Sequence, residues 1–222
     1  MKYVLTILAL CLCVTGCGKK NTPNSQAKAK ATLKAESMWV SDLNDPNNVK
    51  IEAAIRKDAR KPTGELTKAD LRKVTRLVLY DNKLTDVKGL EKLTQLDELY
   101  LENNQLTNVP EGLEKLTKLE VLYLHSNQLT DVKGLEKLTR LEVLHLSGNQ
   151  LTNVPEGLEK LTKFRWLELG DNPLTDVKSL EKLTQLERLD ARGNKLTDVK
   201  GLEKFTKLKV LDLNGNQLVD VK

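Results

Sequence analysis

The chain has 222 residues, a formal net charge of +5 and 39% hydrophobic residues. Residues 1–37 hold six basic residues and one acidic residue, so residues 38–222 carry no net charge. Because non-specific nucleic-acid binding needs basic charge on the folded surface, the composition argues against a nucleic-acid partner.

The first segment has the pattern of an export signal. Lys2 gives it a positive start, and residues 3–14 form an apolar run that is too short to span a bilayer. The run ends in Val14-Thr15-Gly16-Cys17, which resembles a bacterial lipobox. That resemblance implies that residues 1–16 are a lipoprotein signal peptide and that Cys17 is lipidated. The alternative is an ordinary cleaved signal with an incidental cysteine.

Residues 17–37 are polar, basic and poor in large apolar side chains, which predicts a disordered tether. The basic charge either holds this tether against anionic lipid head groups or only keeps it soluble. By lipoprotein analogy, Gly18 is not the aspartate that retains a lipoprotein at the inner membrane. We therefore expect an exported protein anchored by lipid to a bacterial membrane. This is the outer membrane in a two-membrane cell, with the chain periplasmic or surface-exposed.

Residues 38–73 are predicted to form a helical N-terminal cap. Asp45-Pro46 has the pattern of a helix start, and Thr67 with Asp70 resembles a capping box. Trp39 is expected to pack inside the cap. A rough apolar stripe marks the buried side of the first helix: Val49, Ile51, Ala54, Ile55 and Ala59.

Residues 74–222 contain seven copies of the frame Leu-x-x-Leu-x-Leu-x-x-Asn-x-Leu, spaced by 22 or 23 residues. The asparagines are Asn82, Asn104, Asn127, Asn149, Asn172, Asn194 and Asn216. A fixed period of this length predicts a leucine-rich repeat solenoid of the α/β class. We expect a right-handed, curved parallel sheet with short helices or turns on the convex side.

The frame assigns a role to each repeated residue. Side chains alternate across a strand, so the leucines point inward and the residues between them point outward. The asparagine amide is expected to bond buried backbone groups of its own and neighbouring turns. Ala191 replaces a leucine, which predicts either a small gap or neighbouring residues drawn inward.

Residues 51–90, IEAAIRKDARKPTGELTKADLRKVTRLVLYDNKLTDVKGL, resemble the cap and first repeat of internalin-type bacterial proteins. The resemblance continues to Lys222 and implies the repeat fold; it also allows host-cell adhesion, although no cell-wall sorting tail is visible. No polar closing element follows the seventh repeat, which predicts an open edge and fraying of residues 208–222. We expect a monomer unless that edge pairs with another chain.

The outward positions differ between repeats, so they are the best candidates for specific binding. Tyrosine, tryptophan and arginine are typical of interface hot spots, and an acidic set beside them suits a basic or mixed-charge protein segment. The alternative is the general preference of strands for aromatic and β-branched residues. The predicted partner-binding residues are Tyr80, Tyr100, Val121, Tyr123, His125, Val143, His145, Trp166, Glu168, Arg188, Asp190 and Asp212.

Metal binding and catalysis are both disfavoured. Glu102, His125, His145 and Glu168 lie on a diagonal of the sheet, but neighbours on it are about 8 Å apart at the backbone. The repeats contain no cysteine, phosphate-binding glycine loop or nucleophile elbow, so neither an enzyme nor a cofactor is predicted.

The sequence thus predicts a non-enzymatic envelope lipoprotein that binds a protein ligand of unknown identity. The alternative is a glycan-binding, cell-wall-binding or adhesion protein that uses the same aromatic residues.

Overall fold

The computed structural model describes residues 39–154 and 156–219 of the chain. The predicted signal peptide, the tether and the lipidated Cys17 lie outside the described residues. Within the described ranges, no helix has both the length and the apolar character that a membrane crossing requires.

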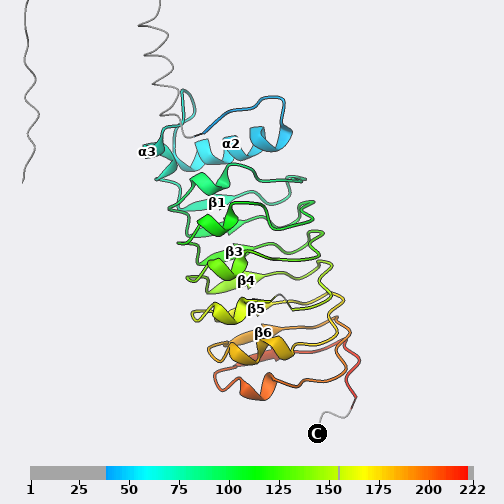
Figure 1. Cartoon of the computed structure of the whole chain (residues 1–222). Coiled ribbons are helices and arrows are strands. Elements are labelled where there is room, and N and C mark those ends of the chain that lie inside the picture. The colour runs from blue at the N-terminus through cyan, green and yellow to red at the C-terminus, as the bar shows by residue number, and fades with distance from the viewer. Residues whose placement is uncertain (1–38, 155, 220–222) are drawn as a thin grey trace, which may run out of the picture. The chain divides into compact units, whose positions relative to one another are not determined.

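Seven short parallel strands form one open sheet (Figure 1). They are arranged in chain order, so each strand pairs with the strands directly before and after it in the chain. The strands are β1 (Arg76–Val78), β2 (Glu98–Tyr100), β3 (Val121–Tyr123), β4 (Val143–His145), β5 (Trp166–Glu168), β6 (Arg188–Asp190) and β7 (Val210–Asp212). Equivalent residues of the repeats stand opposite one another, such as Leu99 and Leu122. The predicted leucine-rich repeat solenoid is therefore confirmed.

The core is a continuous stack of leucines from successive repeats. The central leucines of β2 to β6 are completely buried: Leu99, Leu122, Leu144, Leu167 and Leu189. Burial of one such side chain stabilises a protein by roughly 1.5–3 kcal/mol. Leu211, the equivalent residue of β7, is 44% exposed, so the last described repeat is the least covered by neighbouring residues.

The repeated asparagines bind the backbone of successive turns together. Asn127 Oδ1 accepts a hydrogen bond from Leu106 N at 3.0 Å, and its Nδ2 donates to Leu101 O at 2.9 Å and Leu124 O at 3.1 Å. The same pattern recurs at the other buried asparagines: Asn104, Asn149, Asn172 and Asn194. The predicted structural role of the asparagines is confirmed.

The Leu-Glu-Lys segments form 3₁₀ helices opposite the sheet. They are η1 (Leu90–Lys92), η2 (Leu113–Lys115), η3 (Leu135–Lys137), η4 (Leu158–Lys160), η5 (Lys178–Lys182) and η6 (Leu202–Lys204). A glycine with positive φ precedes five of them, for example Gly112 at φ 88°. Ser179 takes the glycine's place in the fifth turn, and η5 there extends over five residues.

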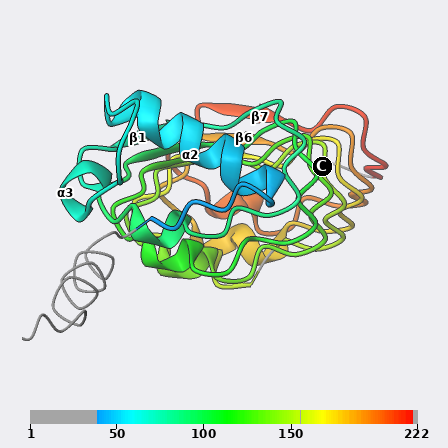
Figure 2. The ribbon, with the colours of Figure 1, turned by 90° about the horizontal axis from the view of Figure 1, so that it is seen from above.

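The cap consists of α2 (Pro46–Asp58) and α3 (Lys68–Leu71), and α2 lies across the β1 end of the solenoid (Figure 2). Thr67 and Asp70 form the expected capping box at α3. Trp39 is buried and donates its indole N–H to Glu52 at 3.1 Å, as its predicted packing role requires. Ile51 and Ile55 are the residues of α2 that are fully buried. Val49 is 42% exposed, so its prediction as part of the apolar stripe was wrong.

Candidate functional site

The outward positions of the strands form a continuous surface, which we call the concave face. Cross-strand pairing places its first two columns in register from β1 to β7. Backbone hydrogen bonds such as Asn103 N to His125 O continue that register into a third column. The second column includes Tyr100, Tyr123, His145 and Glu168, and the third includes Glu102, His125 and Ser147.

Four rings of this face contact one another, and we call them the aromatic row: Tyr100, Tyr123, His125 and His145. The Tyr100 and Tyr123 rings meet edge to face with centroids 5.1 Å apart. The ring of Tyr123 also meets His145 at 5.4 Å and His125 at 5.9 Å. The two imidazoles stack at 3.9 Å with an interplanar angle of 23°. The three edge-to-face contacts of Tyr123 have a preferred geometry of aromatic pairs, so these rings support one another.

Charged residues hold both ends of the aromatic row. At one end, the Arg76 guanidinium lies 4.9 Å from the Tyr100 ring centroid, and Tyr100 Oη donates to Glu98 at 2.9 Å. At the other end, Glu168 contacts His145 Nε2 at 3.1 Å and accepts from Arg188 Nε at 3.1 Å. Contacts with charged residues thus fix both ends of the row within the protein itself.

Burial keeps the aromatic row uncharged near neutral pH. Burial lowers the pKa of His145 to about 4, with smaller contributions from the positive charges of His125, Arg192 and Arg188. Burial also lowers the pKa of His125 and raises the pKa of Tyr123. The contact of His145 with Glu168 favours its protonated form, but desolvation outweighs it. The face therefore presents neutral imidazoles and phenols.

The other predicted aromatic residues stand apart from the row. Tyr80 is 50% exposed and Trp166 is 47% exposed, and neither makes a ring contact within the part of the chain that the structure describes. Val121 and Val143 are half-buried and lie between β2 and β5 in the first column. These residues extend the apolar part of the concave face on both sides of the row.

Two of the three acids in the predicted acidic set form ion pairs with arginines of the same chain. Glu168 is paired with Arg188, while Asp190 lies 3.6 Å from Arg192 and is only 3% exposed. Gly170 leaves room for this pair, because a Cβ there would lie 3.0 Å from Arg192 and 3.2 Å from Asp190. Asp190 is therefore not the accessible acid that the sequence suggested, and Asp212 bonds the Asn214 backbone N–H at 3.0 Å.

Three polar atoms of the third column are buried without a hydrogen-bond partner: Glu102 Oε2, His125 Nδ1 and Ser147 Oγ. Sequence reasoning did not include Glu102 or Ser147 among the binding residues. Their shared column was visible from the repeat spacing, but the missing partners depend on side-chain conformations. Among the described residues, no group of three or more histidine, cysteine or acidic side chains could hold a metal ion.

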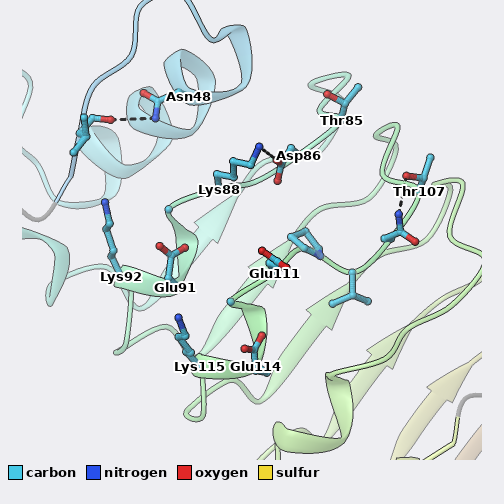
Figure 3. Close-up of a pocket in the computed structure, with 16 residues that line it drawn as sticks. Asn48, Thr85, Asp86, Lys88, Glu91, Lys92, Thr107, Glu111, Glu114 and Lys115 are labelled. Carbon is cyan, nitrogen blue, oxygen red and sulfur yellow. Dashed lines mark hydrogen bonds and ion pairs between the residues drawn. The ribbon is translucent and has the colours of Figure 1, made fainter.

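A groove of about 920 Å³ lies between the cap and the turns after β1 and β2 (Figure 3). Both acidic and basic residues line its walls: Asp86, Lys88, Glu91, Lys92, Glu111, Glu114 and Lys115. Some of these groups neutralise one another, as Lys88 and Asp86 do at 2.9 Å. The groove contains no buried polar atom that lacks a partner. The concave face is thus the stronger candidate for specific recognition.

Family models match the repeats along their whole length. The model described as "Leucine Rich repeats (2 copies)" matches residues 72–115, 94–137, 117–160 and 184–222. A second, described as "Leucine rich repeat", matches residues 139–196. No curated protein sequence matches the chain significantly.

Solved structures of bacterial repeat proteins are similar to this one. Internalin C2 of Listeria monocytogenes has a TM-score of 0.64 and 29% identity over 80% of this chain and 90% of its own. A second Listeria monocytogenes internalin has a TM-score of 0.63 and 26% identity over 79% of this chain and 60% of its own. A leucine-rich repeat protein of Leptospira interrogans has a TM-score of 0.61 and 29% identity, covering 68% of this chain and 45% of its own.

Proposed function

Because this chain belongs to the leucine-rich repeat family and is internalin-like, we propose that it binds a protein partner through its concave face. The binding is non-enzymatic and takes place at the cell envelope. The repeats act as a rigid scaffold that presents one face to the partner.

The observation that carries this proposal is the preassembled aromatic row. Tyr100 and Tyr123 are held by ring contacts and by Arg76 and Glu98, so they lose little conformational freedom on binding. Low ordering cost and large apolar rings are features of interface hot spots. Trp166 and Tyr80 add exposed apolar surface beside the row.

The contrast between the two sides of the solenoid supports the same surface. The convex Leu-Glu-Lys turns are nearly identical from repeat to repeat, whereas no two repeats have the same set of outward strand residues. Only the side whose residues vary, the concave face, can distinguish one partner from another. The pairing of Glu168 with Arg188 favours a partner with mixed polarity over a purely basic one.

The envelope location rests on the N-terminal sequence. We propose that Cys17 carries the lipid anchor, because Val14-Thr15-Gly16 precedes it directly after an apolar run. Labelled fatty acid should enter the wild type and the Cys13→Ser variant but not Cys17→Ser. Equal labelling of the wild type and Cys17→Ser would exclude this anchor.

Capture of envelope components by the full chain tests the binding proposal. Wild type should retain a specific protein, and Tyr100→Ala or Tyr123→Ala should weaken its retention by about tenfold or more. Leu43→Ala is the matched control, because it removes an apolar side chain that is 86% exposed but lies before α2. Retention that Leu43→Ala and Tyr123→Ala reduce equally would contradict the proposal. Retention of purified peptidoglycan in place of protein would favour glycan binding.

A further inference from the structure

The third column of the concave face contains an unusual set of polar atoms. Glu102, His125 and Ser147 follow β2, β3 and β4 at equivalent positions, and each has a buried atom without a partner. The serine side chain is the most enclosed, with the residue only 8% exposed. A buried polar atom without a partner costs roughly 1–3 kcal/mol, so three adjacent ones are a destabilising feature that needs a reason.

Glu102 differs from the other carboxylates of this face. Glu98 is paired with Arg76, Glu168 with Arg188, and Asp190 with Arg192. Asp212 accepts a backbone hydrogen bond. Among the outward-facing carboxylates that the structure describes, Glu102 is therefore the one that has neither an ion pair nor a hydrogen bond. The arginines of the concave face already form ion pairs with these other acids.

We propose that Glu102, with Ser147 and His125, receives an arginine side chain of the partner protein. This inference rests on the proposed function, since it names the chemistry by which the concave face recognises its partner. The half-buried carboxylate supplies a negative charge that has no partner within the chain. The Ser147 oxygen is enclosed in the free protein, so it becomes a second acceptor only when the side chains around it move on binding.

The chemistry of the surroundings favours a guanidinium. The groups without partners can each accept a hydrogen bond: a carboxylate oxygen, a hydroxyl oxygen and, in one of its two tautomers, an imidazole nitrogen. A guanidinium donates five hydrogen bonds in one plane and stacks on aromatic rings, whereas an ammonium is a compact and strongly hydrated charge. The Tyr123 ring, 5.9 Å from His125, provides the aromatic neighbour. An anionic ligand would be repelled by Glu102.

The binding of a small probe to the full chain tests this site directly. The probe is the tripeptide acetyl-Gly-Arg-Gly-amide, and its controls carry citrulline or lysine in the central position. Citrulline has nearly the same shape without the charge. Binding is followed by the NMR shifts of the imidazole signals of His125 and His145. Glu102→Gln removes the charge, and Glu114→Gln removes a carboxylate from η2 on the opposite side.

The arginine probe should move the His125 signal in wild type and in Glu114→Gln, and its affinity should fall about tenfold in Glu102→Gln. The citrulline probe should leave the signal in place. Equal affinity of the lysine probe, or an undiminished effect in Glu102→Gln, would overturn the assignment.

Partner capture separates this inference from the proposed function. If both are correct, Tyr123→Ala and Glu102→Gln each weaken retention of the captured protein. If retention falls in Tyr123→Ala but is unchanged in Glu102→Gln, the concave face binds the partner and the arginine site is wrong. If neither variant affects retention, both proposals fail.

Discussion

The imidazole rings of His125 and His145 stack with centroids 3.9 Å apart, although the two residues belong to different columns and different repeats. Their backbones lie on a diagonal of the sheet, and the side chains close the distance by turning toward each other. His145 is further fixed by Glu168 at 3.1 Å, and both imidazole rings meet the Tyr123 ring in an edge-to-face arrangement. This pair joins the second and third columns into one surface.

The His145 imidazole should make the folded protein sensitive to acid. The unfolded chain binds a proton on this group near pH 6.5, whereas the folded chain does so only near pH 4. Because the unfolded state binds more protons between these values, stability is complete above pH 6.5 and is lost as the pH falls toward 4. His145→Phe should keep the ring contacts and lose less stability over this window. The melting temperature of both proteins across the pH range measures the difference.

Asn127→Ala should strongly destabilise the solenoid. The change leaves Leu106 N buried without a partner, whereas Leu101 O and Leu124 O each lose one bond and keep those from Asn104 and Asn149. We expect a loss of about 2 kcal/mol, measured as a lower urea midpoint. Asn108→Ala is the control, because Asn108 is exposed and bonds only Thr107. A similar loss in the control would mean that asparagine has a general effect in these turns.

Alanine substitutions at Gly89 and Gly134, two glycines on the convex side, distinguish the cost of backbone strain from the cost of a packing clash. Both have positive φ, 94° and 98°, so alanine is strained at either position. A Cβ at Gly89 would lie 2.8 Å from Trp39, whereas a Cβ at Gly134 meets nothing within 4 Å. Gly89→Ala should therefore cost about 1–3 kcal/mol more than Gly134→Ala in thermal unfolding. Equal costs would show that the cap moves away from Gly89 without penalty.

Ser147→Ala should stabilise the free protein by about 1 kcal/mol, because it removes a buried hydroxyl that has no partner. Ser179→Ala, at an exposed position of η5, should change stability little. The same Ser147→Ala variant should bind the arginine tripeptide more weakly. A destabilised Ser147→Ala would mean that the hydroxyl makes a favourable contact in the free protein.

The repeated residues predicted the fold because their period fixes which side chain lies inside. Leu122 and Asn127 have the same environment as their counterparts one repeat away, so one frame determines the sheet register and the hydrogen-bond pattern. The neighbouring positions of Tyr100 and Tyr123 followed from the same spacing.

Side-chain conformation limited what could be predicted about the site. The burial of Asp190 depends on Arg192 folding over the space that Gly170 leaves open, and a repeat frame does not contain that information. The stacking of His125 on His145 also depends on rotamers, as do the missing partners of Glu102 and Ser147. The sequence therefore predicted which residues lie on the concave face, but it did not predict which of them contact one another.

The most direct test of concave-face binding is photo-crosslinking in living cells, with a photoreactive amino acid at position 123 of the full chain and, separately, at position 115. Tyr123 lies in the aromatic row, and Lys115 is exposed at the end of η2 on the convex side. The proposed function predicts a discrete protein adduct from position 123 and none from position 115. An adduct from position 115 alone, or the same adduct from both positions, would contradict it.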